Sequence, residues 1–226
     1  MLITIPGVLD PPLLAQCREA LAGADWSDGR GSAGYLSRAV KNNSQLPDTD
    51  ATGRRLGDLI LARLEQNSMF VAAALPLKVL PPLFNRYAEA QAYGAHIDGA
   101  IRPVAGTHHR VRTDLAATLF LSDPEGYVGG ELVIRDTFGE RAVKLAAGDL
   151  VLYPGTSVHR VEPVTSGERL AAFFWIQSMV RDVTQRTLLF DLDGAIQRLA
   201  KDVPGHAALV DLAGVYHNLL RVWADS

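Results

Sequence analysis

The pattern of apolar positions divides the chain into a helical start, a strand-rich middle and a helical end. Apolar residues recur at helical spacing in residues 11–24 and 51–74, and Pro11-Pro12 and Thr49-Asp50 are typical of helix starts. Residues 27–50 are rich in Gly, Ser, Asn and Asp, which favours a loop with little regular structure. After residue 180, two amphipathic stripes separated by Pro204-Gly205 predict two more helices.

Between residues 77 and 179, short runs rich in Val, Leu, Phe and Tyr are separated by Gly, Pro and Asp turns. No long helical patterns alternate with these runs, which argues against a parallel sheet built from βαβ units. We expect an antiparallel sandwich or jelly roll of about eight strands. The predicted strands are Leu77–Ala90, His96–Ile101, Val111–Leu121, Glu131–Asp136, Arg141–Leu145, Leu150–Tyr153, Val158–Val164 and Arg169–Ser178.

Composition narrows the kinds of site that the chain can carry. Hydrophobic residues make up 48% of the 226 residues, enough for a packed core, and a formal net charge of −3 gives no basic surface for a nucleic-acid partner. The single cysteine, Cys17, excludes an intramolecular disulfide and a thiolate cluster, so a metal site would need His, Asp or Glu. The chain start lacks a secretion-signal pattern, and no run approaches the roughly 20 apolar residues of a membrane span. We therefore expect a cytoplasmic protein without a membrane partner.

The first candidate metal ligands lie in the segment Tyr93-Gly94-Ala95-His96-Ile97-Asp98-Gly99. On a strand, His96 and Asp98 would project from the same face and offer an imidazole beside a carboxylate. His159 follows on a late strand of the same expected roll. Two imidazoles and one carboxylate are the facial triad of non-haem Fe(II) sites, which leaves positions open for a co-substrate and O₂.

Arg169 follows ten residues after His159. Two adjacent antiparallel strands would bring it back toward the metal, where its planar guanidinium suits a carboxylate held by two hydrogen bonds. The alternative is a surface arginine that pairs with its neighbour Glu168.

In this combination the residues resemble the Fe(II)- and 2-oxoglutarate-dependent dioxygenases of the prolyl 4-hydroxylase type, and more closely the bacterial PKHD-type hydroxylases. The resemblance spans essentially the whole chain, and Gly129-Gly130-Glu131-Leu132 and Arg112–Ser122 are similar to strand segments of that family. It implies the roles of four side chains in the site. Iron would be bound by His96, Asp98 and His159, and the far carboxylate of 2-oxoglutarate by Arg169.

The resemblance also assigns two tyrosines to the cofactor-binding set. The Tyr87 hydroxyl would reach the 2-oxoglutarate carboxylate, and Tyr93 would face the substrate pocket. For both, a strand tyrosine that packs on the core is an equal alternative, because tyrosine favours partly buried strand positions. Related halogenases replace the carboxylate ligand by a small residue, so the presence of Asp98 implies hydroxylation.

The implied fold is α+β with a mainly β core, a double-stranded β-helix or jelly roll with N-terminal helices packed outside. We expect a dioxygenase domain over residues 1–180, with helices in about 11–74 and the jelly roll in about 77–179. Residues 181–226 would form a C-terminal helical extension. Its amphipathic helices would either close the roll or pair with a second copy in a homodimer.

The implied reaction uses Fe(II), O₂ and 2-oxoglutarate, which is decarboxylated to succinate and CO₂ while a peptidyl, prolyl or small-metabolite substrate is hydroxylated. L-ascorbate is the expected reductant, and the family suggests a role in bacterial iron uptake. The alternatives are a cupin-like metal dioxygenase that does not use 2-oxoglutarate and a non-catalytic module that responds to iron. We expect the loops at 27–48 and 102–112 to select the substrate. His108-His109 would lie in a basic loop near the mouth, either solvated or in contact with an acidic substrate. Trp175 would pack in the core, with a place in the pocket lining as the alternative.

Overall fold

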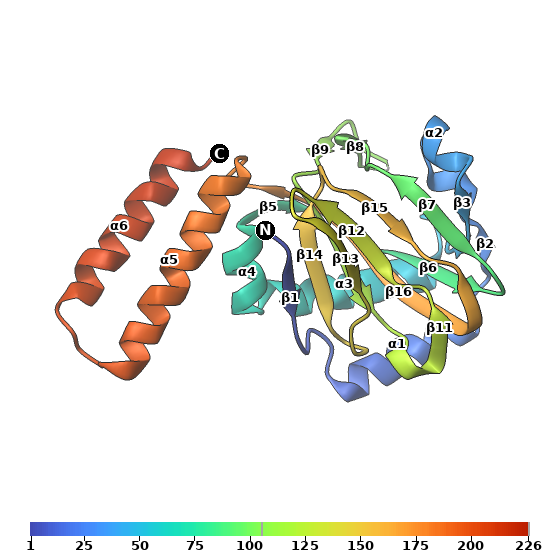
Figure 1. Ribbon diagram of the computed structural model, residues 1–226, viewed down its shortest axis with the longest axis horizontal. Helices are drawn as coiled ribbons and strands as arrows, with labels where there is room; N and C mark the ends of the chain where they lie inside the picture. Colours follow the sequence, from blue (N-terminus) through green and yellow to red (C-terminus); the bar gives the residue numbers. More distant parts are fainter. Residues whose placement is uncertain (105, 226) are drawn as a thin grey trace.

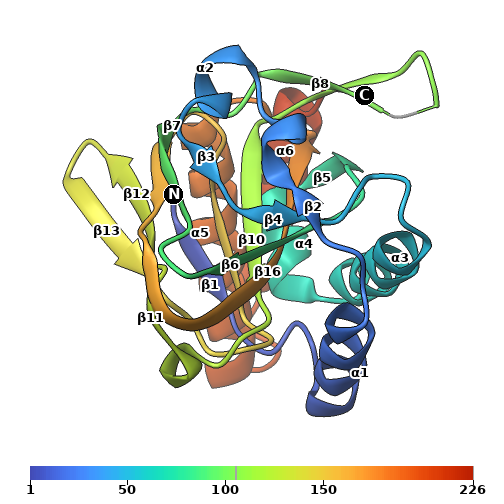
Figure 2. The ribbon, with the colours of Figure 1, turned by 90° about the vertical axis from the view of Figure 1, so that its right-hand side faces the viewer.

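The computed structural model describes residues 1–104 and 106–225, and two antiparallel sheets form its body (Figures 1 and 2). The first sheet has the order β1 (Ile3–Ile5), β14 (Leu150–Pro154), β10 (Leu115–Phe120), β16 (Val164–Ser178), β6 (Leu83–Ala88), β4 (Ser44–Gln45) and β2 (Ser27–Asp28), with β5 (Pro76–Val79) and β11 (Tyr127–Gly129) paired to β16. The second sheet has the order β13 (Gly139–Val143), β12 (Leu132–Asp136), β15 (Val158–Val161), β7 (Ala92–His96) and β3 (Lys41–Asn42). A separate hairpin joins β8 (Ile101–Pro103) to β9 (Arg110–Arg112). Facing antiparallel sheets confirm the predicted sandwich.

The central strands of the first sheet are buried on both faces, which explains their nearly continuous apolar sequence. Alternate residues of a strand point to opposite faces. On β10, Ala116 and Phe120 therefore pack between the two sheets, whereas Leu115, Ala117 and Leu119 pack on the outer side. The same alternation on β16 points Arg169 and Trp175 into the space between the sheets. The molecule thus has an inter-sheet core and a second core under the helices.

Helices α1 (Pro11–Ala22), α3 (Ala51–Glu65) and α4 (Ser68–Ala74) cover the outer face of the first sheet (Figure 2). The carboxylates of Asp10 and Asp50 accept hydrogen bonds from the backbone at the starts of α1 and α3. The predicted helix over residues 51–74 is interrupted, because the Asn67 side chain accepts a hydrogen bond from the Phe70 N–H and begins a new helix. Cys17 is buried among apolar residues of this outer core.

Several predicted strand boundaries are wrong for identifiable reasons. The run 77–90 is split into β5 and β6 by Pro81-Pro82, which have no N–H for a strand ladder. β16 begins at Val164 rather than Arg169, because its first residues pair with β11. The strand His96–Ile101 is also wrong, because β7 ends at His96 and β8 begins only at Ile101.

The segment 27–50 contains more structure than its composition predicts. It holds the short strands β2, β3 and β4, the 3₁₀ turn η1 (Gly29–Ser32) and the single-turn helix α2 (Tyr35–Arg38). β3 pairs with β7 and β4 with β6, and β2 adds to β4, so the regularity of these strands comes from pairing rather than from their own apolar pattern. A second 3₁₀ turn, η2 (Pro124–Gly126), precedes β11.

The helices predicted after residue 180 are confirmed as α5 (Val183–Asp202) and α6 (Ala208–Trp223). They form an antiparallel pair that extends away from the sheets instead of closing the roll (Figure 1). The pair is anchored where Leu189 packs with Leu75 and Val180. No described residue of α6 is buried, and none of the described helices is long and apolar enough to cross a membrane.

The Gly129-Gly130 turn joins β11 to β12 with two residues at positive φ, +77° and +69°. A Cβ at Gly129 would overlap the Pro163 carbonyl oxygen, and a Cβ at Gly130 would lie 3.1 Å from Cδ of Arg169. The turn therefore needs glycine for its backbone conformation and for the close approach of neighbouring chain, including the stem of Arg169.

We predict that Gly129→Ala lowers the free energy of unfolding by about 3 kcal/mol, because left-handed strain adds to a backbone overlap. The matched control is Gly7→Ala, since Gly7 has a φ of +61° with open space around it. This control should cost only the strain, about 1–2 kcal/mol. Urea unfolding of both variants measures the difference, and equal losses would contradict the overlap.

Candidate active site

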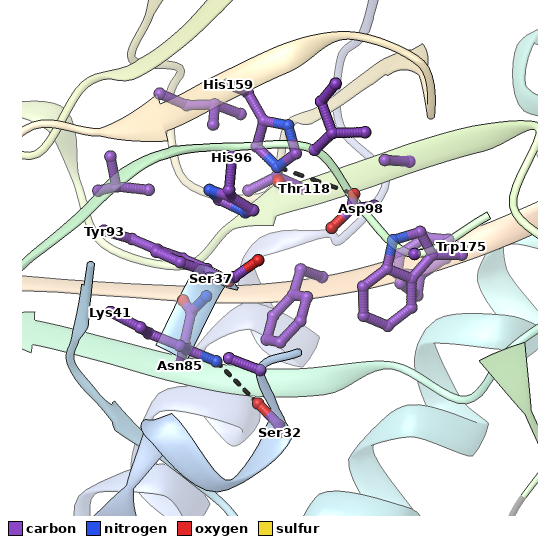
Figure 3. Close-up of a pocket in the computed structure, with 18 of the residues that line it drawn as sticks. Ser32, Ser37, Lys41, Asn85, Tyr93, His96, Asp98, Thr118, His159 and Trp175 are labelled. Atoms are coloured by element: carbon purple, nitrogen blue, oxygen red, sulfur yellow. Dashed lines mark hydrogen bonds and ion pairs between the residues drawn. The ribbon is translucent and has the colours of Figure 1, made fainter. Parts of the chain in front are cut away.

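A pocket that is partly open to solvent lies between the facing sheets (Figure 3). Strands β6, β10, β14 and β16 line it from the first sheet, and β3, β7, β12 and β15 line it from the second. Residues 32–37 and 97–103 form its rim and continue into a surface groove. Several inward positions of these strands carry polar side chains, so this end of the inter-sheet space is not filled by apolar packing.

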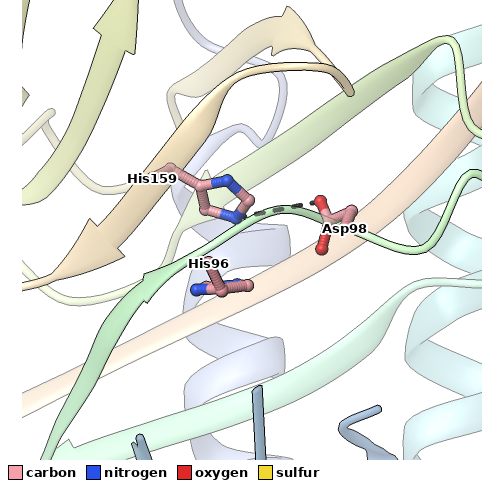
Figure 4. Close-up of side chains that lie close together, drawn as sticks. All are labelled: His96, Asp98 and His159. Carbon is pink, nitrogen blue, oxygen red and sulfur yellow. Dashed lines mark ion pairs between the residues drawn. The ribbon is translucent and has the colours of Figure 1, made fainter. Parts of the chain in front are cut away.

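His96, Asp98 and His159 meet at one wall of the pocket (Figure 4). One ligand atom from each lies within 4.8 Å of the others, so the three side chains form a group able to hold a metal ion. The two histidines are directly opposed on the paired strands β7 and β15, and their ring centroids are 4.2 Å apart. Nε2 of His159 lies 3.7 Å from Oδ2 of Asp98. The structure therefore brings together the three residues that the sequence singled out.

Asp98 reaches this group differently from the sequence prediction. It does not share a strand face with His96, because the chain leaves β7 at His96. The irregular segment that follows is held by Thr113, whose N–H donates to the Ala100 carbonyl (3.0 Å) and whose hydroxyl donates to the Gly99 carbonyl (2.9 Å). Tertiary hydrogen bonds, rather than strand alternation, place the carboxylate beside the imidazoles.

Backbone carbonyls orient both imidazole rings. Nδ1 of His96 lies 2.8 Å from the Gly94 carbonyl oxygen, and Nδ1 of His159 lies 3.1 Å from the Ser157 carbonyl oxygen. A carbonyl only accepts, so each Nδ1 carries a hydrogen, and in the neutral ring this leaves Nε2 as the ligand atom. Burial, reinforced by the nearby His159, lowers the pKa of His96 to about 4, which keeps this ring neutral near pH 7.

Arg169 is only 1% exposed and lies in the pocket lining. The alternative of a surface arginine paired with Glu168 is therefore wrong. The prediction that Arg169 returns to the site on a strand adjacent to that of His159 is also wrong. β15 and β16 are not adjacent strands, because they belong to the two facing sheets. Arg169 thus approaches the pocket from the sheet opposite His159.

The Arg169 guanidinium has few partners for a buried cation. Its Nε has no hydrogen-bond partner, and Nη1 lies 3.5 Å from Oδ1 of Asn85. In the part of the chain that the structure describes, no carboxylate lies within 4.0 Å of it. A buried charge of this kind is costly until an anion or further hydrogen bonds compensate it.

Tyr87 lies directly beside Arg169, because the two are paired across β6 and β16. The guanidinium carbon is 5.3 Å from the Tyr87 ring centroid. Burial raises the pKa of Tyr87 to about 12 although the charge of Arg169 opposes the shift, so the phenol keeps its proton. Tyr93 also faces the pocket, and its ring stacks on His96 with the centroids 3.6 Å apart.

Comparison with known proteins adds to this geometry. Residues 82–177 match the family model of the 2OG-Fe(II) oxygenase superfamily, and residues 184–225 match that of the PKHD-type hydroxylase C-terminal domain. PKHD-type hydroxylases of Bordetella pertussis and Pseudomonas putida strain W619 are each 58% identical over 225 residues, with 100% of both chains covered. The chain belongs to the PKHD-type hydroxylase family. It is therefore an oxidoreductase of a family that uses Fe(II), 2-oxoglutarate and O₂.

Solved structures with low identity support the fold of this hydroxylase. A Pseudomonas putida prolyl-4-hydroxylase superposes with a TM-score of 0.51 at 21% identity, covering 78% of this chain and 92% of that chain. HygX from Streptomyces hygroscopicus, with nickel, 2-oxoglutarate and hygromycin B bound, gives a TM-score of 0.54 at 18% identity, covering 78% and 82%. These neighbours are 2OG-Fe(II) oxygenases with a jelly-roll fold, so the predicted fold class is confirmed.

Three pocket residues of the hydroxylase differ from the sequence expectation or were missed. Trp175, expected in the core, packs on the inter-sheet core and also faces the pocket. Lys41 and Arg102 line the pocket as well. Both lie in the segments expected to select the substrate, 27–48 and 102–112, but no local pattern distinguishes them from the other residues of those segments. The pair His108-His109 is exposed between β8 and β9 and lies outside the pocket lining.

Proposed function

We propose that this hydroxylase binds Fe(II) through His96, Asp98 and His159 and binds the far carboxylate of 2-oxoglutarate through Arg169. The observation that carries the proposal is the buried Arg169 guanidinium, which has no carboxylate partner among the described residues and lies in the same pocket as the His-Asp-His group. A metal ligand set alone fits several classes of enzyme. A buried cation that lacks an anion in that pocket favours a dicarboxylate co-substrate over the cupin-like alternative, which needs no such residue.

The donor set fits Fe(II). Two neutral imidazole nitrogens and one carboxylate oxygen form the facial triad of non-haem iron oxygenases and leave sites for 2-oxoglutarate and O₂. The Gly94 and Ser157 carbonyls hold the imidazoles in the tautomer that coordinates through Nε2. Asp98 occupies the ligand position that a halogenase would leave open, which supports hydroxylation.

The surroundings of Arg169 fit a carboxylate. The Nε–H of Arg169 has no hydrogen-bond partner and the Tyr87 hydroxyl keeps its proton, so both would donate to the carboxylate. When bound, iron and 2-oxoglutarate supply the oxidation, in which O₂ provides one oxygen to succinate and one to the substrate hydroxyl, with release of CO₂. The protein's part is to orient the co-substrate and keep water from this end of the pocket. Tyr93, stacked on His96, would limit the substrate side.

The substrate would be a peptidyl or prolyl residue or a small metabolite, selected by residues 27–48 and 102–112. The rim of the pocket supports this assignment, because residues 32–37, Arg102 and Pro103 line it. L-ascorbate would serve as reductant. The protein would act in the cytoplasm, and the family suggests a role in bacterial iron uptake.

The proposed division of the chain has a dioxygenase domain over residues 1–180 and a helical extension over 181–226. Its support is that the oxygenase model ends at residue 177 and the C-terminal model begins at 184. The extension would also hold a homodimer together, since the apolar side chains of Val210 and Val222 on α6 are exposed.

We predict that His159→Ala weakens Ni(II) binding, measured by calorimetry, roughly 100-fold or more, because one of three ligands is lost. Succinate formation from 2-oxoglutarate with Fe(II) and ascorbate should fall to background. The matched control is His108→Ala, an exposed histidine outside the pocket, which should behave as wild type. Full turnover by His159→Ala would refute the triad, and absence of succinate with the wild-type protein would favour the non-catalytic module.

We predict that Arg169→Gln raises the KM for 2-oxoglutarate about 10–100-fold, since charge-assisted hydrogen bonds of about 1.5–3 kcal/mol are lost. Ni(II) affinity should stay close to wild type. Without 2-oxoglutarate, the variant should unfold at the same or a higher temperature, because an uncompensated buried charge is removed. Arg86→Gln on β6, a partly exposed arginine that pairs with Glu168, is the control. Unchanged 2-oxoglutarate affinity in Arg169→Gln would contradict the assignment.

For the extension, we predict that sedimentation at micromolar concentration shows a dimer and that Val210→Asp together with Val222→Asp shifts it to a monomer, because charges would be placed on the apolar contact. A wild-type monomer would exclude this role of α6.

A further inference from the structure

Lys41 and Arg102 are two more cations of the active-site pocket, and the triad and the co-substrate do not use them. Lys41 lies on β3 and is only 4% exposed, and Arg102 lies on β8 at the rim. Nζ of Lys41 donates to Oγ of Ser32 (2.7 Å; Figure 3) and to Oε1 of Gln45 (2.9 Å), both neutral acceptors. Across residues 1–104 and 106–225, no carboxylate lies within 4.0 Å of either cation.

Both cations lie against aromatic rings close to the His-Asp-His group. Nζ of Lys41 is 5.2 Å from the centroid of Tyr93, the ring that stacks on His96. The guanidinium carbon of Arg102 is 3.7 Å from the centroid of Trp175. These contacts hold the two positive groups at the pocket wall and rim, apart from the buried surroundings of Arg169.

The charges of the loaded pocket leave these two cations without a counterpart. The charges of Fe(II) and Arg169 are balanced by the Asp98 carboxylate and the two carboxylates of 2-oxoglutarate. For Lys41 the remaining carboxylates are the more distant Asp28 and Asp48, and for Arg102 it is Asp48; none of these forms an ion pair with either cation. Burial, and next the repulsion from Arg102, lower the pKa of Lys41 to about 8 although Asp98, Asp28 and Asp48 oppose the shift, so Lys41 is still mostly protonated near pH 7 and has no carboxylate in contact among the described residues.

We propose that the primary substrate carries a carboxylate that binds between Lys41 and Arg102 and so holds the reacting C–H group toward the metal. The inference rests on the proposed function, because the balance of charge assumes Fe(II) and 2-oxoglutarate in the pocket. The rings of Tyr93, Phe173 and Trp175 would contact the apolar part of the same molecule. The substrate class is thus an organic acid or an acidic end of a larger molecule, and a neutral substrate is disfavoured.

The test compares probes that differ in charge but hardly in shape. Phenylacetate is paired with phenylacetamide and butyrate with butyramide, and ligand-observed NMR titrations use the full chain saturated with Ni(II) and 2-oxoglutarate. We expect the carboxylate of at least one pair to bind about tenfold or more tightly than its amide, the ratio that about 1.4 kcal/mol of charge interaction gives. Equal binding within both pairs, or no binding of either carboxylate, overturns the proposal.

Variants locate the preference. Arg102→Gln and Lys41→Gln should each reduce carboxylate binding about tenfold and leave amide binding within about twofold. Arg102→Gln is the decisive variant if the buried Lys41 is needed for folding. Arg110→Gln, an exposed arginine on β9 outside the pocket lining, is the matched control and should keep the preference.

The affinity for 2-oxoglutarate separates the two proposals. If Arg102→Gln weakens 2-oxoglutarate rather than the probes, Arg102 belongs to the co-substrate site and the inference is wrong while the proposed function stands. If the wild-type protein forms no succinate from 2-oxoglutarate, the proposed function fails whatever the probes show.

Discussion

Burying the Arg169 guanidinium between two sheets is the constraint on which the arrangement of the pocket depends. The inter-sheet core elsewhere is apolar, and a cation within it is stable only with an anion or with donors and acceptors that satisfy it. The surrounding strands supply Tyr87 and Asn85, which are polar and neutral, instead of a carboxylate. The protein thus keeps the position of an anion available to a ligand, at a cost in stability that ligand binding would recover.

The His-Asp-His group lies across the pocket from Arg169, and strand pairing rather than charge burial determines its geometry. Its imidazoles are opposed on two hydrogen-bonded strands, so their separation is set by the sheet itself. The carbonyls of Gly94 and Ser157 then set the rotation and the tautomer of the rings. Rigid strands position the histidines while a tethered irregular segment positions Asp98. Lys41 and Arg102, at the wall and rim, lie outside both arrangements, so in our proposals substrate recognition and oxygen chemistry use different residues.

All described residues that line the pocket belong to the sheets and to the segments between their strands. No described residue of α5 or α6 lines the pocket, and their anchor on α4 lies at the edge of the outer core. The C-terminal pair is therefore free to serve assembly without disturbing the strands that carry the ligands. The helices α1, α3 and α4 have the opposite relation to the site, because they bury the outer face of the strands that carry Arg169 and Tyr87.

The sequence by itself determined the sandwich and the outer and C-terminal helices, because period-two and helical patterns are local properties. Side-chain chemistry and the family resemblance also made His96, Asp98, His159 and Arg169 the candidate site residues. Only the tertiary structure decided that β15 and β16 lie in opposite sheets, that Asp98 is placed by Thr113, and that Lys41 and Arg102 join the pocket. It also revealed the carbonyls that orient the histidines. The first three features depend on pairing between segments that are far apart in the sequence. The carbonyls are backbone groups that every residue has, so no side-chain pattern predicts which of them will contact a histidine.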